Sequence, residues 1–165
     1  MKKILIITFC LFSFNAVAAG VVAEEAYIRL LPPTQKVTGA FMVLKNHSAE
    51  NRAVVSAQSD VSASMELHTH VHDNGVMRMR QVEKIDVPAQ GEAVLKPGGL
   101  HMMLIGLKQP LTLGQIVDIK LSFDDGSSDV IQAEVKKILS GMSGMKKKMQ
   151  HQKTMDHGKM KEMTQ

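Results

Sequence analysis

Histidines and methionines are concentrated between residues 65 and 103 of this 165-residue chain, where four of its seven histidines lie. These side chains are Met65, His68, His70, His72, Met77, Met79, His101, Met102 and Met103. A thioether is soft and uncharged, so it suits Cu(I) and binds zinc, magnesium or calcium poorly, whereas imidazole serves copper and zinc alike. A neutral set of two histidines and two methionines could therefore hold Cu(I) without burying negative charge, and could release it by stepwise ligand exchange.

The alternation of side chains along a strand limits which of these residues can meet. His101 and Met103 are two residues apart, so on a strand both side chains face the same side. Met102 then faces the other way, and we expect it to belong to the core. Met77 and Met79 share a face in the same manner.

A turn at residues 73–75, with the sequence Asp-Asn-Gly, predicts a hairpin that brings histidine and methionine together. A two-residue loop places His70 opposite Met79. A four-residue loop, from residue 72 to residue 75, places His68 there instead. The residues alone do not choose between the two registers, because loop length decides which residues pair.

Short runs of β-branched and aliphatic residues, separated by turn residues, extend from residue 26 to residue 137. No stretch in this span shows a long helical period, and the spacing of the runs is typical of an all-β, antiparallel Greek-key sandwich or barrel. The predicted strands are Ala26–Leu30, Gly39–Leu44, Arg52–Ser56, Ser64–His70, Met77–Glu83, Glu92–Leu95, His101–Ile105, Ile116–Phe123 and Val130–Lys136.

Residues 1–19 are predicted to form a secretory signal peptide, with Lys2-Lys3, an apolar run and small residues at 16–19. The run is too short to span a bilayer and no later run reaches 18 apolar residues, so no membrane anchor is expected. The only cysteine, Cys10, lies in this segment. We therefore expect a periplasmic domain at residues 20–139 that has neither disulfides nor thiolate metal sites.

Composition also excludes several classes of function. Residues 20–139 contain 12 basic and 14 acidic side chains and only three aromatic ones, which argues against nucleic-acid binding. No phosphate-binding loop, HExxH or GxSxG motif is present, and we predict that the protein is not an enzyme. A blue-copper electron carrier would need a cysteine ligand, and none remains after export.

Residues 140–165 differ in composition from the domain and are predicted to form a flexible, disordered tail rich in Met, His and Lys. Three interpretations remain open: a solubilising extension, a basic amphipathic helix on an anionic membrane, or a copper-gathering arm with thioethers for Cu(I) and histidines for Cu(II). Its candidate ligands are Met142, Met145, Met149, His151, Met155, His157, Met160 and Met163.

The spacing of four of these residues resembles the H-x10-M-x21-H-x-M signature of the periplasmic copper chaperones called PCuAC. In this chain the signature falls on His68, Met79, His101 and Met103. The flanking residues also resemble the family, with Val-Met-Arg-Met-Arg at 76–80 and Leu-Lys-Pro-Gly-Gly-Leu-His-Met-Met-Leu at 95–104. The resemblance covers roughly residues 24–137.

The resemblance implies a cupredoxin-like β-barrel that binds one Cu(I) through His68, Met79, His101 and Met103. It also implies copper delivery toward the CuA centre of cytochrome c oxidase, in subunit II, often alongside Sco-type proteins. It favours the four-residue hairpin loop. The resemblance places His70 where many relatives carry methionine, so three interpretations of His70 stay open: a bystander, a replacement ligand or part of a second site.

Two alternatives to this site and function stay open at the level of sequence. His68, His70 and His72 could form a three-imidazole Zn²⁺ or Cu²⁺ site on one strand face, or could simply face solvent near a turn. Possible auxiliary copper ligands are His70, Met77 and His72. A copper storage or resistance protein, which sequesters the metal and does not hand it on, is the alternative function.

Overall fold

The computed structural model describes residues 20–73 and 75–138, which form ten strands and no helix, so none of this part could cross a membrane as a helix. The predicted signal peptide, the tail ligands and residue 139 lie outside the described residues. The strands are β1 (Val21–Arg29), β2 (Val37–Asn46), β3 (Arg52–Gln58), β4 (Ser64–Asp73), β5 (Val76–Gln81), β6 (Ile85–Val87), β7 (Glu92–Leu95), β8 (His101–Ile105), β9 (Ile116–Phe123) and β10 (Ser128–Lys136).

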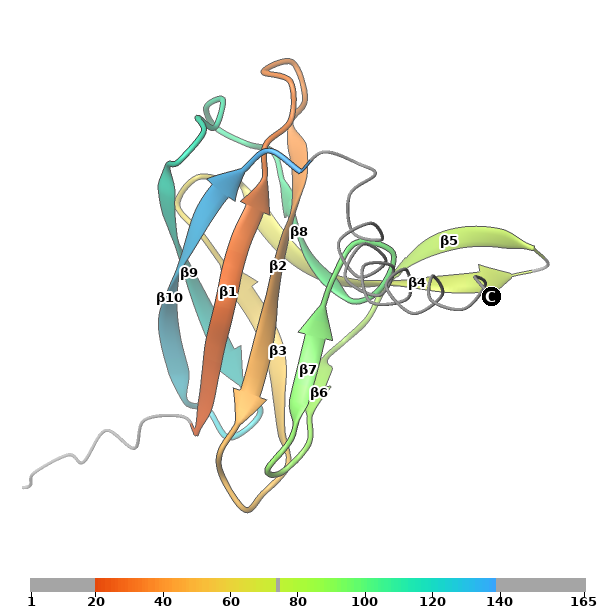
Figure 1. Cartoon of the computed structure of the whole chain (residues 1–165), viewed down its shortest axis with the longest axis vertical. Helices are drawn as coiled ribbons and strands as arrows, with labels where there is room; N and C mark the ends of the chain where they lie inside the picture. The colour runs from red at the N-terminus through yellow and green to blue at the C-terminus, as the bar shows by residue number, and fades with distance from the viewer. Residues whose placement is uncertain (1–19, 74, 139–165) are drawn as a thin grey trace, which may run out of the picture.

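The strands follow one another in a single curled sheet, in the order β5-β4-β8-β2-β1-β10-β9-β3-β6, and β7 pairs with β2. Most of the sheet wraps into a barrel-like sandwich, while the β4–β5 hairpin projects away from it (Figure 1). The predicted all-β fold is confirmed. The expectation of antiparallel pairing throughout was wrong at one place, because β1 and β10 run parallel, with Tyr27 opposite Glu134.

The core lies between the two layers of the sandwich, and alternation along the strands builds it. In β9, for example, Val117, Ile119 and Leu121 are buried while the residues between them are exposed. Strand β6 was not predicted, since three residues are too few to show a period. It nevertheless buries Ile85 and Val87 in the same core.

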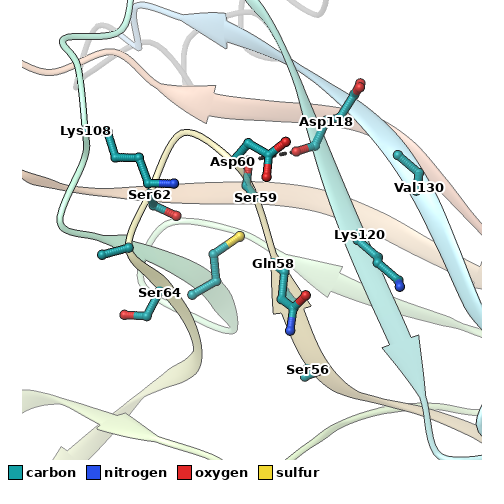
Figure 2. Close-up of a pocket in the computed structure, with 13 residues that line it drawn as sticks. Ser56, Gln58, Ser59, Asp60, Ser62, Ser64, Lys108, Asp118, Lys120 and Val130 are labelled. Carbon is teal, nitrogen blue, oxygen red and sulfur yellow. Dashed lines mark hydrogen bonds between the residues drawn. The ribbon is translucent and has the colours of Figure 1, made fainter.

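Strands β3 and β4 are not paired with each other, because β3 lies between β9 and β6 while β4 lies between β5 and β8. A polar groove of about 720 Å³ lies along the loop that joins β3 to β4, and Figure 2 shows serine, lysine and aspartate side chains around it. The hydroxyl of Ser59 donates to the carbonyl of Asp118 at 2.7 Å and ties the β3–β4 loop to β9. Met65 lines this groove.

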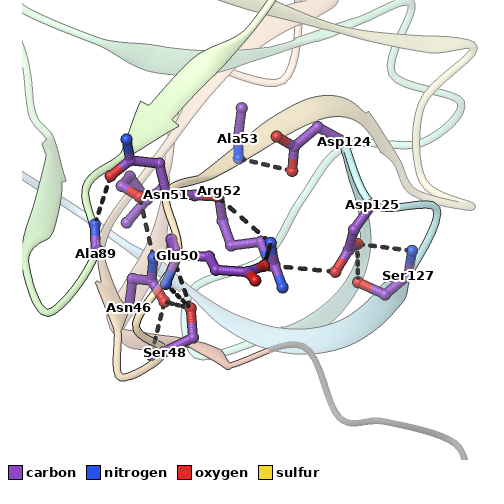
Figure 3. A network of polar contacts seen from close by, with 11 residues as sticks. Asn46, Ser48, Glu50, Asn51, Arg52, Ala53, Ala89, Asp124, Asp125 and Ser127 are labelled. Atoms are coloured by element: carbon purple, nitrogen blue, oxygen red, sulfur yellow. Dashed lines mark hydrogen bonds and ion pairs between the residues drawn. The ribbon is translucent and has the colours of Figure 1, made fainter.

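A polar network fixes the end of the barrel where β2 leads into β3 (Figure 3). Asn46 is 2% exposed, and its amide donates to the carbonyls of Glu50 and Val87 at 2.7 and 3.2 Å. Its carbonyl oxygen accepts hydrogen bonds from the backbone and hydroxyl of Ser48. The buried amide is thus fully partnered, which avoids the cost of an unpaired polar group in the core.

The β4–β5 hairpin has the two-residue loop. Asp73 pairs with Val76 and His70 lies directly opposite Met79. Gly75 has a φ of 80°, a left-handed conformation that glycine adopts without strain and that tight hairpin turns require. The four-residue loop favoured by the family resemblance was therefore wrong for this chain. All residues of β5 are exposed.

Candidate metal centre

A groove of about 340 Å³ opens at the base of the β4–β5 hairpin, between that hairpin and the edge of β2. Two imidazoles and two thioethers line it: His70 from β4, Met79 from β5, and His101 and Met103 from β8. Three of the four residues named by the sequence signature are therefore brought together. His68, the fourth, does not line the groove.

Strand pairing explains why these side chains share one face. On β8, His101 is opposite His68 of β4 and Met103 is opposite Glu66. His70 lies two residues beyond His68 on the same face. On the other side of β8, Gly39 of β2 pairs with Met103.

Gly39 keeps the wall of the groove open beside Met103. A Cβ at this position would lie 3.0 Å from the ring of Phe41, so that ring would have to shift by a few tenths of an ångström. The Phe41 ring in turn lies 6.2 Å from the ring of His101, centroid to centroid. A larger residue at position 39 would therefore press on the aromatic wall of the groove.

The imidazole of His101 is buried, with 4% exposed, and one carbonyl fixes its orientation. Nδ1 lies 2.9 Å from the carbonyl oxygen of Gly99, so Nδ1 carries the proton and Nε2 keeps its lone pair. Metal-binding histidines usually donate their second nitrogen to such a partner. His101 is thus arranged as a neutral ligand through Nε2.

Burial lowers the pKa of His101 below its ordinary value of 6.5. The Gly99 carbonyl acts in the opposite direction, while the nearby charges of His70 and His68, when protonated, lower this pKa further. The neutral ligand form therefore persists to a lower pH than for a free imidazole.

This depressed pKa predicts a pH-dependent stability of the metal-free protein. The unfolded chain takes up a proton at His101 at higher pH than the folded chain does, so the stabilisation is complete above pH 6.5 and is lost as the pH falls below it. The free energy of unfolding of the wild type should decline below this pH more steeply than that of H101Q. Denaturant unfolding at several pH values measures this, and equal slopes would contradict it.

His70 uses the same carbonyl as His101. Its Nδ1 lies 3.4 Å from the Gly99 oxygen, and its ring centroid is 5.2 Å from that of His101. The residues Pro97-Gly98-Gly99 of this loop are part of the sequence match to the family, but that match gives the loop no role. The role of its carbonyl as a shared acceptor is visible only in the fold.

His68 is in a different situation. It is 8% exposed, and its Nε2 lies 2.8 Å from the carboxylate of Glu66, while Nδ1 is buried without a partner among the described residues. Glu66 was missed by sequence reasoning, although its spacing of two residues from His68 puts both on one strand face. That His68 is a copper ligand stays a prediction.

The methionines divide by face as expected. Met102 is fully buried, which confirms its assignment to the core, whereas Met103 is half-buried at the groove and Met79 is 46% exposed. Met77 pairs with His72 near the tip of the hairpin, and neither lines the groove. The described residues contain no group of three or more His, Cys, Asp or Glu side chains arranged to hold a metal. A centre at this rim would therefore depend on thioethers.

Comparisons with known proteins bear on the family. The family model described as "Putative lipoprotein LpqE-like" matches residues 21–135. The protein described as "Putative lipoprotein Lxx21020", from Leifsonia xyli subsp. xyli, is 36% identical over 120 residues, which cover 72% of this chain and 71% of that protein.

Among solved structures, Cu(I)-loaded DR1885 from Deinococcus radiodurans is 34% identical and superposes with a TM-score of 0.61, covering 76% of this chain and 83% of that one. The apo PCuAC domain of PmoF1 is 18% identical with a TM-score of 0.62, covering 72% and 95%, and shows likeness of fold. The resemblance to PCuAC is confirmed, and the chain belongs to the LpqE-like family, to which that domain is related.

Proposed function

We propose that this protein is a non-enzymatic Cu(I)-binding metallochaperone. The observation that carries the proposal is the groove in which Met79, His101 and Met103 meet a histidine of β4. A solved relative, DR1885, has been determined in a Cu(I)-loaded form, which supports the same cargo here. Thioethers and neutral imidazoles select Cu(I) over harder divalent ions.

The exposure of the groove suits transfer of the metal. Met79 is 46% exposed and stands on an edge strand of which every residue is exposed. An acceptor could therefore replace this thioether first, while the buried His101 still holds the ion. A stepwise exchange of this kind never requires a free copper ion.

The place of action and the acceptor belong to the same proposal. The chain is exported by residues 1–19 and works in the periplasm, where a thiol-free site avoids oxidation to disulfides. Its acceptor is the CuA site of cytochrome c oxidase subunit II, reached directly or through a Sco-type protein. Residues 140–165 act as an auxiliary copper-gathering arm.

The methionines and histidines of residues 140–165 favour one second candidate, a copper storage or resistance protein. Storage predicts several coppers per chain that stay on the tail when an acceptor is added. Delivery predicts that the copper of the groove moves to the acceptor. Metal analysis of both proteins after mixing and separation distinguishes the two functions.

The binding step is tested by titrating residues 20–139 with Cu(I) under reducing conditions, beside residues 20–165. We expect one tightly bound equivalent in the shorter chain and a strong preference over Zn²⁺. Absence of a tight single equivalent in the shorter chain would refute a copper site in the domain.

A further inference from the structure

The end of the barrel that carries the metal groove is rich in basic side chains. Lys36 directly precedes Val37, which lines the groove. Lys96 in the same way precedes Pro97, another lining residue. The basic side chains on the segments that border the groove, which we call the basic rim, are Arg29, Lys36, Arg78, Arg80, Lys96 and Lys136.

The carboxylates near the basic rim each have a partner already. The pairs are Asp73 with Arg78 and Arg80, Glu134 with Lys136, and Glu66 with His68. Arg78 and Arg80 alternate with Met79 along β5, so they occupy the outer face of the hairpin. Lys36 and Lys96 are exposed, and neither forms an ion pair with another described residue. The rim therefore presents an excess of positive charge to the solvent.

The opposite end of the barrel is acidic. Strand β2 runs from Val37 beside the groove to Asn46 at that other end, about 30 Å away for ten residues (Figure 1). The acidic side chains gathered there include Glu24, Glu50, Asp86, Glu92, Asp124 and Asp125, three of which surround Arg52 in Figure 3. The nearly balanced totals of 12 basic and 14 acidic side chains in residues 20–139 thus hide a separation of charge along the barrel.

Two ionisable groups report the opposite signs of the two ends. At the acidic end, a hydrogen bond to Glu24 and the charge of this carboxylate raise the pKa of Lys45. Near the groove, burial raises the pKa of Tyr27, while the positive charges of Arg29 and Lys136 act to lower it. The Debye length at physiological ionic strength is about 8 Å, much shorter than the barrel. A partner that approaches the groove therefore meets the basic rim and is screened from the acidic end.

We propose that the protein that takes copper from this groove presents an acidic surface around its own metal site, and that the basic rim docks this surface over the groove. The inference rests on the proposed transfer of Cu(I). Opposite charges accelerate encounter by about 10- to 1000-fold and orient the partners, here with the groove toward the acceptor. The acidic end repels the same surface, which disfavours unproductive contacts. Anionic lipid shares the charge but offers no soft ligand for Cu(I), so an acidic protein fits better.

The test measures how fast copper leaves wild-type residues 20–165, loaded with one equivalent of Cu(I), for two synthetic peptides. Both peptides carry the same Met-x-x-Met core and one tryptophan, and they differ only in flanking glutamates or glutamines. Because the chain contains no tryptophan, quenching of the peptide's fluorescence reports the arrival of copper. At low salt we expect the acidic peptide to accept copper at least about tenfold faster than the neutral one, and high salt should remove the difference.

The variants K36E/K96E and K84E/K120E change the net charge equally but at different places. Lys84 lies 2.8 Å from Asp86 at the acidic end, and Lys120 is on β9, outside the metal groove. K36E/K96E should lose most of the preference for the acidic peptide with unchanged Cu(I) affinity in chelator competition, whereas K84E/K120E should keep the preference.

Three results would overturn the proposal. These are equal rates for the two peptides with the wild type, an equal loss of preference in both variants, and binding of the wild type to phosphatidylglycerol vesicles that depends on Lys36 and Lys96 while peptide transfer does not. If the wild type binds no Cu(I) in the chelator competition, the proposed function itself fails, and this result is distinct from the other three.

Discussion

Alanine at both Met79 and Met103 is expected to weaken Cu(I) binding by at least about 100-fold, or about 2.7 kcal/mol, without unfolding the protein. The two thioethers line the groove from different strands, and the remaining imidazoles would leave the ion two-coordinate on the protein. Met79 is 46% exposed, so its removal costs little packing. Chelator competition measures the affinity, and circular dichroism of the metal-free protein measures the fold.

Met77 supplies the matched control for this loss. It lies on the same exposed strand as Met79, with the same 46% exposure, but it does not line the groove. Alanine at Met77 should leave the affinity unchanged. Cooperative unfolding of the metal-free double variant at a much lower temperature than the wild type would mean instead that Met79 and Met103 are structural residues.

Alanine at Met102 should have the opposite effect, a loss of about 2–5 kcal/mol in the free energy of unfolding with unchanged Cu(I) affinity in the folded fraction. Met102 is fully buried and pairs with Leu67 of β4 and Ala40 of β2. Its removal leaves a cavity in the core beneath β8, and this strand is held in place by its hydrogen-bonded neighbours β4 and β2. Denaturant unfolding of the metal-free protein measures the loss.

Met103 is the natural control, because it is the next residue on the same strand and differs only in the face it occupies. Alanine at Met103 should cost less stability than alanine at Met102, as its side chain already borders an open groove. If both variants lost equal stability, the division of this strand into a core face and a metal face would be wrong.

The sequence allowed the β-sheet fold and the faces of β8 to be predicted, because alternation survives wherever one side of a strand is buried. Met102 and Met103 illustrate this, since their opposite environments follow from a period of two. The family resemblance also predicted that residues of β5 and β8 lie close together in space, which spacing within one strand could not predict.

Which histidine of β4 lies opposite Met79 could not be predicted, because it depends on the loop length of one hairpin. A difference of two loop residues moves every pair across β4 and β5, and both loops were compatible with the turn residues. The parallel pairing of β1 with β10 also escaped prediction, since the two strands are separated by almost the whole domain.

That parallel pair determines how the protein should be tagged. Leu30 donates its backbone N–H to the carbonyl of Lys136, the last residue of β10, at 2.8 Å. The adjacent Leu31 lines the groove, so β10 ends beside the groove. A polyhistidine tag fused shortly after Lys136 would have an effective concentration of roughly millimolar at the groove and would compete with the groove for copper. A tag before Gly20 is separated from the groove by the length of β1, about 30 Å for nine residues, and is the safer design.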